Sequence, residues 1–278
     1  MDYKSHHEQL INNGTRLDNI LIDDKKIRTL EYFKNKVIIP TNNIQNNMSK
    51  SYKVYSSPVR KIHGTSMVCY TNESEAIIFI DEKLYKSNPP LMHIQLQHEV
   101  LHGLSSGING IPYRFGHITI SNDTVFRGIN EATTQMFAED IYGMRLSKKD
   151  DYFHYTKNIM RILKVLYSSE IIANQYFNGN TSFEDKINEQ TDNGFAEFAS
   201  EINRIYRISQ KEFYNEISQD EESERIYLEN CINEVVTSLI TKSNDPDINQ
   251  KILEEIDQEF YEEYNNKIKP VDVKSTVL

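Results

Sequence analysis

The five residues His98-Glu99-Val100-Leu101-His102 constrain the fold of this chain more than any other stretch of its sequence. Two histidines four positions apart on a helix project from the same face, one turn above the other. Their imidazole nitrogens can then bind a single tetrahedral Zn²⁺ ion together. Glu99 lies beside that position, where its carboxylate can take a proton from a water molecule activated by the ion. The pattern therefore predicts a helix that carries a metal centre.

A second segment, Gly128-Ile129-Asn130-Glu131-Ala132-Thr133-Thr134-Gln135, offers a further ligand. A catalytic zinc ion is held by three protein ligands and keeps one position open for water. We expect a helix from about residue 130 to residue 145, with Asn130 as its N-cap and Glu131 as the third ligand. The alternative for Glu131 is an ordinary first-turn carboxylate that stabilises the start of a helix.

Together, the segments H-E-V-L-H and G-I-N-E-A-T-T-Q resemble the gluzincin metallopeptidases, the thermolysin-like group whose third ligand is a Glu in an Asn-Glu-Ala-type motif. The resemblance covers residues 66 to 145. It implies that His98, His102 and Glu131 bind one Zn²⁺ per chain, and that Glu99 is the general base and later the proton donor. Family members carry an Asp four residues after the Glu ligand, which orients a histidine ligand. This chain has Gln135 there, whose carbonyl can still accept an imidazole N–H.

The activity that the resemblance implies is zinc-dependent hydrolysis of a peptide or protein, at an internal peptide bond. Such a site also needs a donor of a hydrogen bond to the oxyanion of the tetrahedral intermediate. Tyr155 is our first candidate, because it begins the helix after the ligand helix. The other candidates are His154, His117, Tyr113 and Arg114.

The apolar run Ile77-Ile78-Phe79-Ile80 allows two interpretations. In the resembled family, an edge strand before the zinc helix pairs with the extended substrate backbone. The unbroken apolar character of this run fits a central, buried strand equally well.

Two other functions fit the same motif. In the first, the chain is a catalytically inactive, zinc-bearing interaction or regulatory protein whose acidic helical half binds a partner. A protein side chain or a segment of the chain would then fill the fourth zinc position. In the second, the chain is a metal hydrolase that acts on a non-peptide amide. The residues do not reveal the oligomeric state.

The charge of the chain is negative and unevenly distributed. The formal net charge is −10, and residues 151–278 carry 13 Lys and Arg against 25 Asp and Glu. An acidic chain without a basic stripe is a poor nucleic-acid binder. We expect the acidic side chains to lie on solvated helix faces. The two cysteines, Cys69 and Cys231, are expected to be reduced.

The N-terminus gives no sign of secretion or membrane insertion. Residues 1–7 are polar and are not followed by the apolar core of a signal peptide, and no stretch is apolar enough to span a bilayer. We expect a cytoplasmic protein without membrane contact, although export by a signal-less route stays open.

The order of the patterns indicates an α+β fold. We expect a weakly ordered, polar N-terminal lead (1–20), a zincin-like catalytic domain (21–150) and a helical C-terminal subdomain (151–278). The catalytic domain would combine a small mixed sheet, the H-E-x-x-H helix and the Glu-ligand helix. Its elements would be a helix over 22–37, a polar loop over 42–51, strands over 66–70 and 76–81, a helix opening at Pro89-Pro90 and a hairpin within 118–126. The expected C-terminal helices span 152–167, 170–177, 183–188, 195–214, 222–241 and 249–264.

Overall fold

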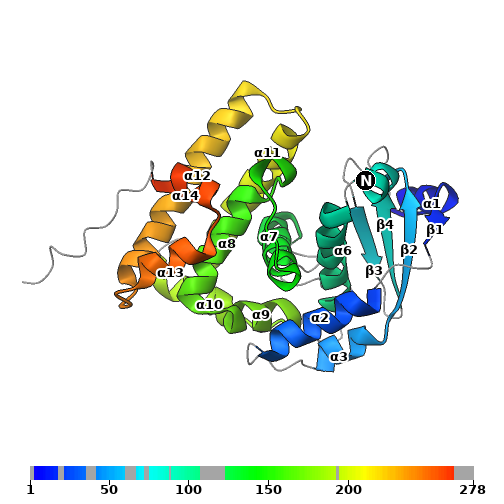
Figure 1. Ribbon diagram of the computed structural model, residues 1–278. Coiled ribbons are helices and arrows are strands. Elements are labelled where there is room, and N and C mark those ends of the chain that lie inside the picture. Colours follow the sequence, from blue (N-terminus) through cyan, green and yellow to red (C-terminus); the bar gives the residue numbers. More distant parts are fainter. Residues whose placement is uncertain are drawn as a thin grey trace, which may run out of the picture. The chain divides into compact units, whose positions relative to one another are not determined.

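The computed structural model describes residues 3–17, 22–35, 42–59, 67–71, 75–87, 89–106, 123–191 and 194–265. Contacts within the chain define two compact units that alternate along the sequence. The sheet unit comprises Met1–Ser121, Phe137–Met144 and Ala173–Asn180, and the helical unit comprises Asn122–Met136, Arg145–Ile172 and Thr181–Leu278. A small mixed sheet and many helices make up the architecture, so the predicted α+β class is confirmed (Figure 1).

Among the described residues, the sheet has four strands in the order β1-β2-β4-β3. Strand β4 (Glu75–Asp81) is parallel to β2 (Ser51–Ser57) and antiparallel to β3 (Met67–Thr71), while the short β1 (Thr15–Arg16) is antiparallel to β2. Both predicted strands are confirmed. Because β4 pairs on both sides, the run Ile77–Ile80 is a central strand, and the hypothesis that it pairs with a substrate is wrong.

Side chains alternate between the two faces of the sheet, as the period of a strand requires. On one face, Ile77 and Phe79 of β4 form a buried cluster with Leu10 of helix α1 (Tyr3–Asn12). The His7 ring of α1 stacks on Tyr70 of β3 at a centroid distance of 4.8 Å. The N-terminal segment is thus part of the core, and the expectation of a weakly ordered lead is wrong for the described residues 3–17.

Further helices complete the sheet unit: α2 (Ile22–Asn35), α3 (Asn42–Met48), α5 (Glu82–Ser87) and α6 (Pro89–Leu104). The predicted helices at 22–37 and from Pro89 are confirmed, but the polar stretch from Asn42 is a helix and not a loop. Helix α6 lies beside β3 (Figure 1). Since β3 is at the edge of the described sheet, α6 packs where the sheet ends.

Helix α7 (Asp123–Tyr142) belongs to both units and is one continuous helix. It begins seven residues before Asn130, so the predictions that Asn130 is an N-cap and that a hairpin extends to residue 126 are wrong. The rest of the expected hairpin lies outside the described residues. Near its C-terminal end, Phe137 meets Phe33 of α2 edge-on at 5.1 Å, and the hydroxyl of Tyr32 donates to Asp140 Oδ2 at 3.1 Å.

The helical unit confirms the predicted series of C-terminal helices. They are α8 (His154–Tyr167), α9 (Ser169–Asn178, whose second half belongs to the sheet unit), α10 (Ser182–Gln190), α11 (Gly194–Phe213), α12 (Gln219–Lys242), α13 (Ile248–Glu255) and α14 (Gln258–Asn265). The segment 249–264, expected as one helix, is two.

The acidic run at 220–224 begins α12, as its charge predicts. Ser218 and Glu221 form a capping box at this N-terminus, each side chain bonded to the backbone N–H of the other. No helix in the part of the chain that the structure describes is both long and apolar enough to cross a membrane.

A buried ionic cluster joins α13 and α14 to α8. Lys157 of α8 pairs with Asp151 at 2.7 Å, and Asn158 donates to Asp257 Oδ2 at 3.0 Å. Glu255 accepts from Lys164 at 2.6 Å and lies 3.8 Å from Arg161, which is fully buried. The Asp151 and Asp257 side chains are 1% and 12% exposed, so the expectation of solvated acidic side chains is wrong for these two, whereas Glu255 is partly exposed. Removing one partner of such a pair leaves an uncompensated buried charge.

His154 makes this cluster sensitive to pH. Its buried imidazole has no hydrogen-bond partner among the described residues and lies 3.8 Å from Asp257 Oδ2. Burial, and then the nearby Lys157 ammonium, lower its pKa. The unfolded chain therefore binds this proton more readily, and the free energy of unfolding must fall as the pH drops below about 6.5.

We predict that His154→Leu reduces this acid sensitivity. Between about pH 7 and pH 5, wild type should lose stability relative to the variant, by at most about 1.4 kcal/mol per pH unit for one proton. Urea unfolding at both pH values measures the difference. An equal loss in both proteins would contradict the assignment.

Candidate metal centre

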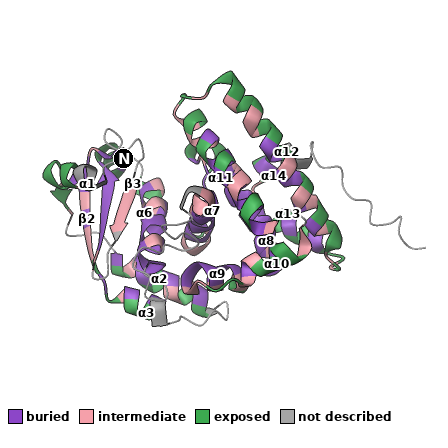
Figure 2. Ribbon diagram, turned by 180° about the vertical axis from the view of Figure 1, so that it is seen from behind, coloured by how far each residue is buried: buried purple, intermediate pink, exposed green. Residues whose placement is uncertain are grey.

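Helix α6, which carries His98, Glu99 and His102, is buried on nearly all sides of its C-terminal half. Pro89 and Pro90 form its first turn, where a missing N–H costs nothing. From Leu96 onward its residues are buried, apart from the half-buried His102 (Figure 2). A helix that is buried on all its faces lies in a core. The polar side chains of α6 are therefore held in a largely dry environment.

The C-terminal end of α6 is fixed by the short helix α3. The side-chain amide of Asn47 donates to the carbonyl oxygens of Leu104, at 2.8 Å, and Ser106, at 2.7 Å. Carbonyl groups at the end of a helix have no partner within the helix, and Asn47 satisfies them from outside. Lys50 Nζ, just after α3, donates to Ser106 Oγ at 2.7 Å.

Two further contacts set the position of α6 against its neighbours. Gln97 Nε2 donates to Thr29 Oγ1 of α2 at 2.9 Å. Tyr52 of β2 lies directly over Gly103, where an added Cβ would overlap the hydroxyl and come within 2.9 Å of Cζ. Lys26 Nζ lies over the Tyr52 ring, 4.3 Å from its centroid. The residue after His102 must therefore be glycine for Tyr52 to pack here.

His98 and His102 direct their ring nitrogens at each other. The two Nε2 atoms are 3.0 Å apart, and the rings are inclined by 74°. Two nitrogens bound to one tetrahedral zinc ion at about 2.0–2.1 Å must lie roughly 3.4 Å apart. The pair thus fits a shared ion after a small adjustment. The same separation suits a hydrogen bond between two neutral imidazoles. Measuring the metal content of the purified protein distinguishes a shared ion from this hydrogen bond.

Glu131 is the third potential ligand near this pair. It lies in the interior of α7, and the ligand atoms of His98, His102 and Glu131 are all within 4.8 Å of one another. His98 is buried and the other two are half-buried, which leaves a side of the group accessible. Two histidines and one glutamate are a known donor set for catalytic zinc with an open position. Because Glu131 is not in a first turn, the alternative that it stabilises a helix start does not apply.

Glu99 is buried on α6 and affects the titration of Cys69 on the adjacent strand β3. Burial raises the pKa of the Cys69 thiol on β3 well above its usual value, and the negative charge of Glu99 raises it further. Cys69 is opposite Ile78 of β4. Neither cysteine of the chain forms a disulfide, as expected.

The remaining predicted site residues are not among the three potential metal ligands. Gln135 is buried on α7, one turn beyond Glu131, and its role as a histidine orienter stays a prediction. Tyr113, Arg114 and His117 lie outside the described residues. His154 belongs to the ionic cluster of the helical unit.

The structure argues against Tyr155 as the oxyanion donor. Its hydroxyl lies 3.0 Å from the carbonyl oxygen of Glu229 and 2.8 Å from Asn233 Oδ1, both on α12. Because a phenol carries one proton, that proton is donated within this contact. Position next to a helix start was not enough to predict which way the ring points.

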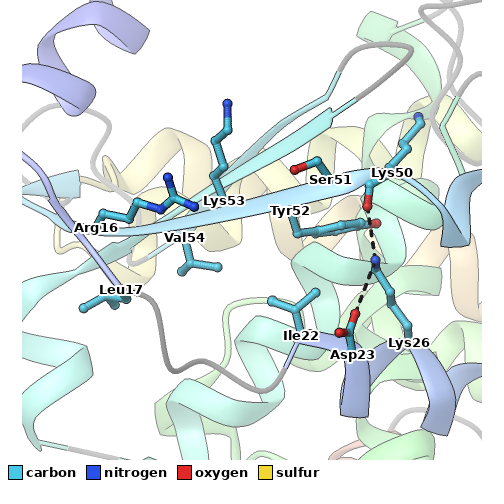
Figure 3. A pocket seen from close by; sticks show the side chains of 10 residues that line it. All are labelled: Arg16, Leu17, Ile22, Asp23, Lys26, Lys50, Ser51, Tyr52, Lys53 and Val54. Carbon is cyan, nitrogen blue, oxygen red and sulfur yellow. Dashed lines mark hydrogen bonds and ion pairs between the residues drawn. The ribbon is translucent and has the colours of Figure 1, made fainter.

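A hollow of about 310 Å³ lies elsewhere in the sheet unit, beside β2 and the start of α2 (Figure 3). Figure 3 shows the Lys26 ammonium between Asp23 and the carbonyl of Lys50, at 3.6 and 3.2 Å. Tyr52 lines this hollow and reaches α6. None of the three potential metal ligands lines the hollow. The lining residues are Arg16, Leu17, Ile22, Asp23, Lys26, Lys50, Ser51, Tyr52, Lys53 and Val54.

Comparisons of this chain with models of known protein families, with curated proteins and with solved structures gave no match.

We predict that Gly103→Ala destabilises the protein by about 1–3 kcal/mol, because the new methyl group displaces the Tyr52 ring. The better helix propensity of alanine offsets at most about 1 kcal/mol. Thermal melts of Gly103→Ala, Tyr52→Leu and the double variant measure the coupling. Equal costs of Gly103→Ala with and without the Tyr52 ring would contradict the contact.

We predict that Tyr155→Phe lowers the free energy of unfolding by about 0.5–1.5 kcal/mol, the usual net value of one hydrogen bond. Activity should be retained. Tyr227→Phe on α12, whose side chain is largely exposed, is the matched control and should change neither. A large loss of kcat in Tyr155→Phe at unchanged stability would restore Tyr155 as a catalytic candidate.

Proposed function

We propose that this protein is a zinc-dependent peptidase of the gluzincin type, with a zincin-like arrangement of α6, β3 and α7. One observation carries the proposal: a buried helix directs the Nε2 atoms of His98 and His102 to a separation of 3.0 Å, and Glu99 follows His98 in the chain. Burying polar side chains is costly, and packing alone gives no reason to place His98 and Glu99 in a core beside His102. Glu131 supplies the carboxylate that such a centre requires.

The chemistry follows from these residues. When bound, zinc supplies a Lewis acid that polarises a carbonyl and lowers the pKa of water. His98, His102 and Glu131 would bind the ion and hold it in a fixed position. Glu99 accepts the proton of the attacking water at a carboxylate oxygen and passes it to the leaving amine nitrogen. The burial of α6 limits the access of other water to this proton transfer.

Strand β3 is the proposed binding edge for the substrate backbone. Among the described strands, it pairs with β4 alone, and its residues Val68 to Tyr70 are half-buried. It also contacts α6. An extended peptide added to this edge would form backbone hydrogen bonds alongside the helix with the histidines. Binding of a peptide or protein in this way does not depend on one particular sequence.

The test is Glu99→Gln, because it separates metal binding from chemistry. The amide is nearly isosteric and leaves the three ligands in place, so the variant should fold and retain about one zinc per chain. Without a carboxylate to accept the proton, cleavage should fall at least about 10²-fold. Metal analysis and proteomic cleavage profiling measure both quantities. His102→Ala is the control, and it should lose zinc and activity together.

Two results would overturn the proposal. Wild type without zinc would show that the histidines form only a hydrogen-bonded pair. Zinc-loaded wild type and Glu99→Gln with the same cleavage profile would exclude Glu99 as the base, and the zinc-bearing interaction protein would become the better account.

A further inference from the structure

The imidazole of His154 is buried where the start of α8 meets the turn between α13 and α14. The residue is 5% exposed, and neither ring nitrogen has a hydrogen-bond partner among the described residues. Nδ1 lies 3.8 Å from Asp257 Oδ2, which is too far for a hydrogen bond, and the Phe260 ring of α14 meets the imidazole edge-on at 6.1 Å. Without a hydrogen-bond partner, a charged imidazole is much less stable in this place than in water.

The carboxylate nearest to His154 already has other partners. Asp257 accepts a hydrogen bond from Asn158 at 3.0 Å, and its oxygens lie 3.5 Å from Lys157 Nζ and 3.7 Å from Arg145. The charged groups that face His154 or these ion pairs, among the described residues, are Arg145, Lys148, Lys157, Arg161, Lys164, Asp151, Glu255, Asp257 and Glu259. Cations thus exceed carboxylates before His154 gains a proton. Burial, and then the Lys157 ammonium, accordingly lower the pKa of His154.

Helices α13 and α14 depend on α8 for their stability. Each has eight residues, and among the described elements their main contacts are with α8. The buried apolar side chains of this segment are Ile248, Ile252, Ile256 and Phe260. Helices of this length are marginal in water by themselves, so both require their packing on α8. Opening of such a segment costs less free energy than unfolding of the whole protein.

We propose that α13 and α14 form a latch on α8 that acid releases: the two helices are docked at neutral pH and detach when His154 takes up a proton. In the released state His154 is in water, where a histidine is protonated below about pH 6.5. The docked state takes up this proton only at lower pH. Each pH unit below about 6.5 therefore weakens docking by up to about tenfold. This inference goes beyond the proposed peptidase function and does not depend on it.

The Asp257 carboxyl does not titrate in the same range. Burial acts in the opposite direction, but Lys157 and Asn158 lower the pKa of Asp257 below its usual value. The stability that this carboxylate contributes is therefore complete above about pH 4 and is lost only at lower pH. Between pH 7 and pH 5, His154 is the group of this pair that changes its charge.

Release of the latch uncovers a basic face of α8. Lys157, Arg161 and Lys164 follow His154 at intervals of three, four and three residues, so the four side chains share one face of the helix. At neutral pH the carboxylates of Glu255 and Asp257 cover these cations. A fall in pH would therefore exchange a covered, neutralised face for an exposed basic one.

The experiment is hydrogen–deuterium exchange of the full chain at pH 7 and pH 5, expressed as protection factors to remove the intrinsic pH dependence of exchange. In wild type, the amides of α13 and α14 should be less protected than those of α11, and their protection should fall by up to about 30-fold at pH 5. In His154→Leu, which cannot take up the proton, this fall should disappear. His93→Leu is the matched control, because His93 Nδ1 on α6 also has no hydrogen-bond partner among the described residues. It should behave as wild type does.

Three results would overturn the latch. Protection of α13 and α14 in wild type that is the same at pH 7 and pH 5 would show that acid does not release them. An equal fall in wild type and His154→Leu would assign the effect to another group. Equal protection of α11, α13 and α14 at both pH values would show that the two helices open only when the whole helical unit unfolds. If His154→Leu does not fold, His154→Gln, which is uncharged at both pH values, serves in its place.

Discussion

The burial of α6 is the constraint on which the sheet unit depends. This helix places His98 and Glu99 in the interior, where polar groups are stable only if their surroundings hold them in place. The neighbours do so from three directions: Asn47 by hydrogen bonds to the C-terminal carbonyls, Thr29 by a hydrogen bond from Gln97, and Tyr52 by packing over Gly103. A loosely held helix could not keep two imidazole nitrogens 3.0 Å apart. The short α3 and the ends of α2 and β2 thus serve the site without belonging to it.

Local patterns predicted the elements whose packing follows from their own residues. The apolar run of β4 and the helical periodicity of α2 and the C-terminal helices were sufficient. The errors fell on polar segments. Residues 42–48 are rich in Asn, a poor helix former, yet they form α3, whose Asn47 bonds to residues 57 and 59 positions later. Residues 3–12 form a helix because Leu10 fills a cluster built by β4. Tertiary contacts of this kind override propensity and are not visible in a local window.

The predictions for the candidate site were likewise correct where local geometry decides and wrong where tertiary contacts decide. The spacing of four predicted that His98 and His102 face each other, because helix geometry alone decides it. The start of α7 was misplaced by seven residues, since Asn130 offered a plausible cap while the real helix begins earlier. For the oxyanion donor, the sequence offered many tyrosines and no means of choosing. Tyr155 turns toward α12, where its hydroxyl contacts Asn233 and the carbonyl oxygen of Glu229.

The acidic half of the chain shows why net charge alone describes a domain poorly. Part of its charge is used internally: Asp151, Glu255 and Asp257 bind the cations of α8. A buried ion pair adds little net stability, but breaking it is costly, so such a cluster selects one packing of α13 and α14 over others. Tyr152 and Phe153, which hold the Tyr206 ring, come directly before α8 and directly after Asp151. Hence the ionic cluster fixes the start of α8 and, through Tyr152 and Phe153, the place where the Tyr206 ring of α11 packs.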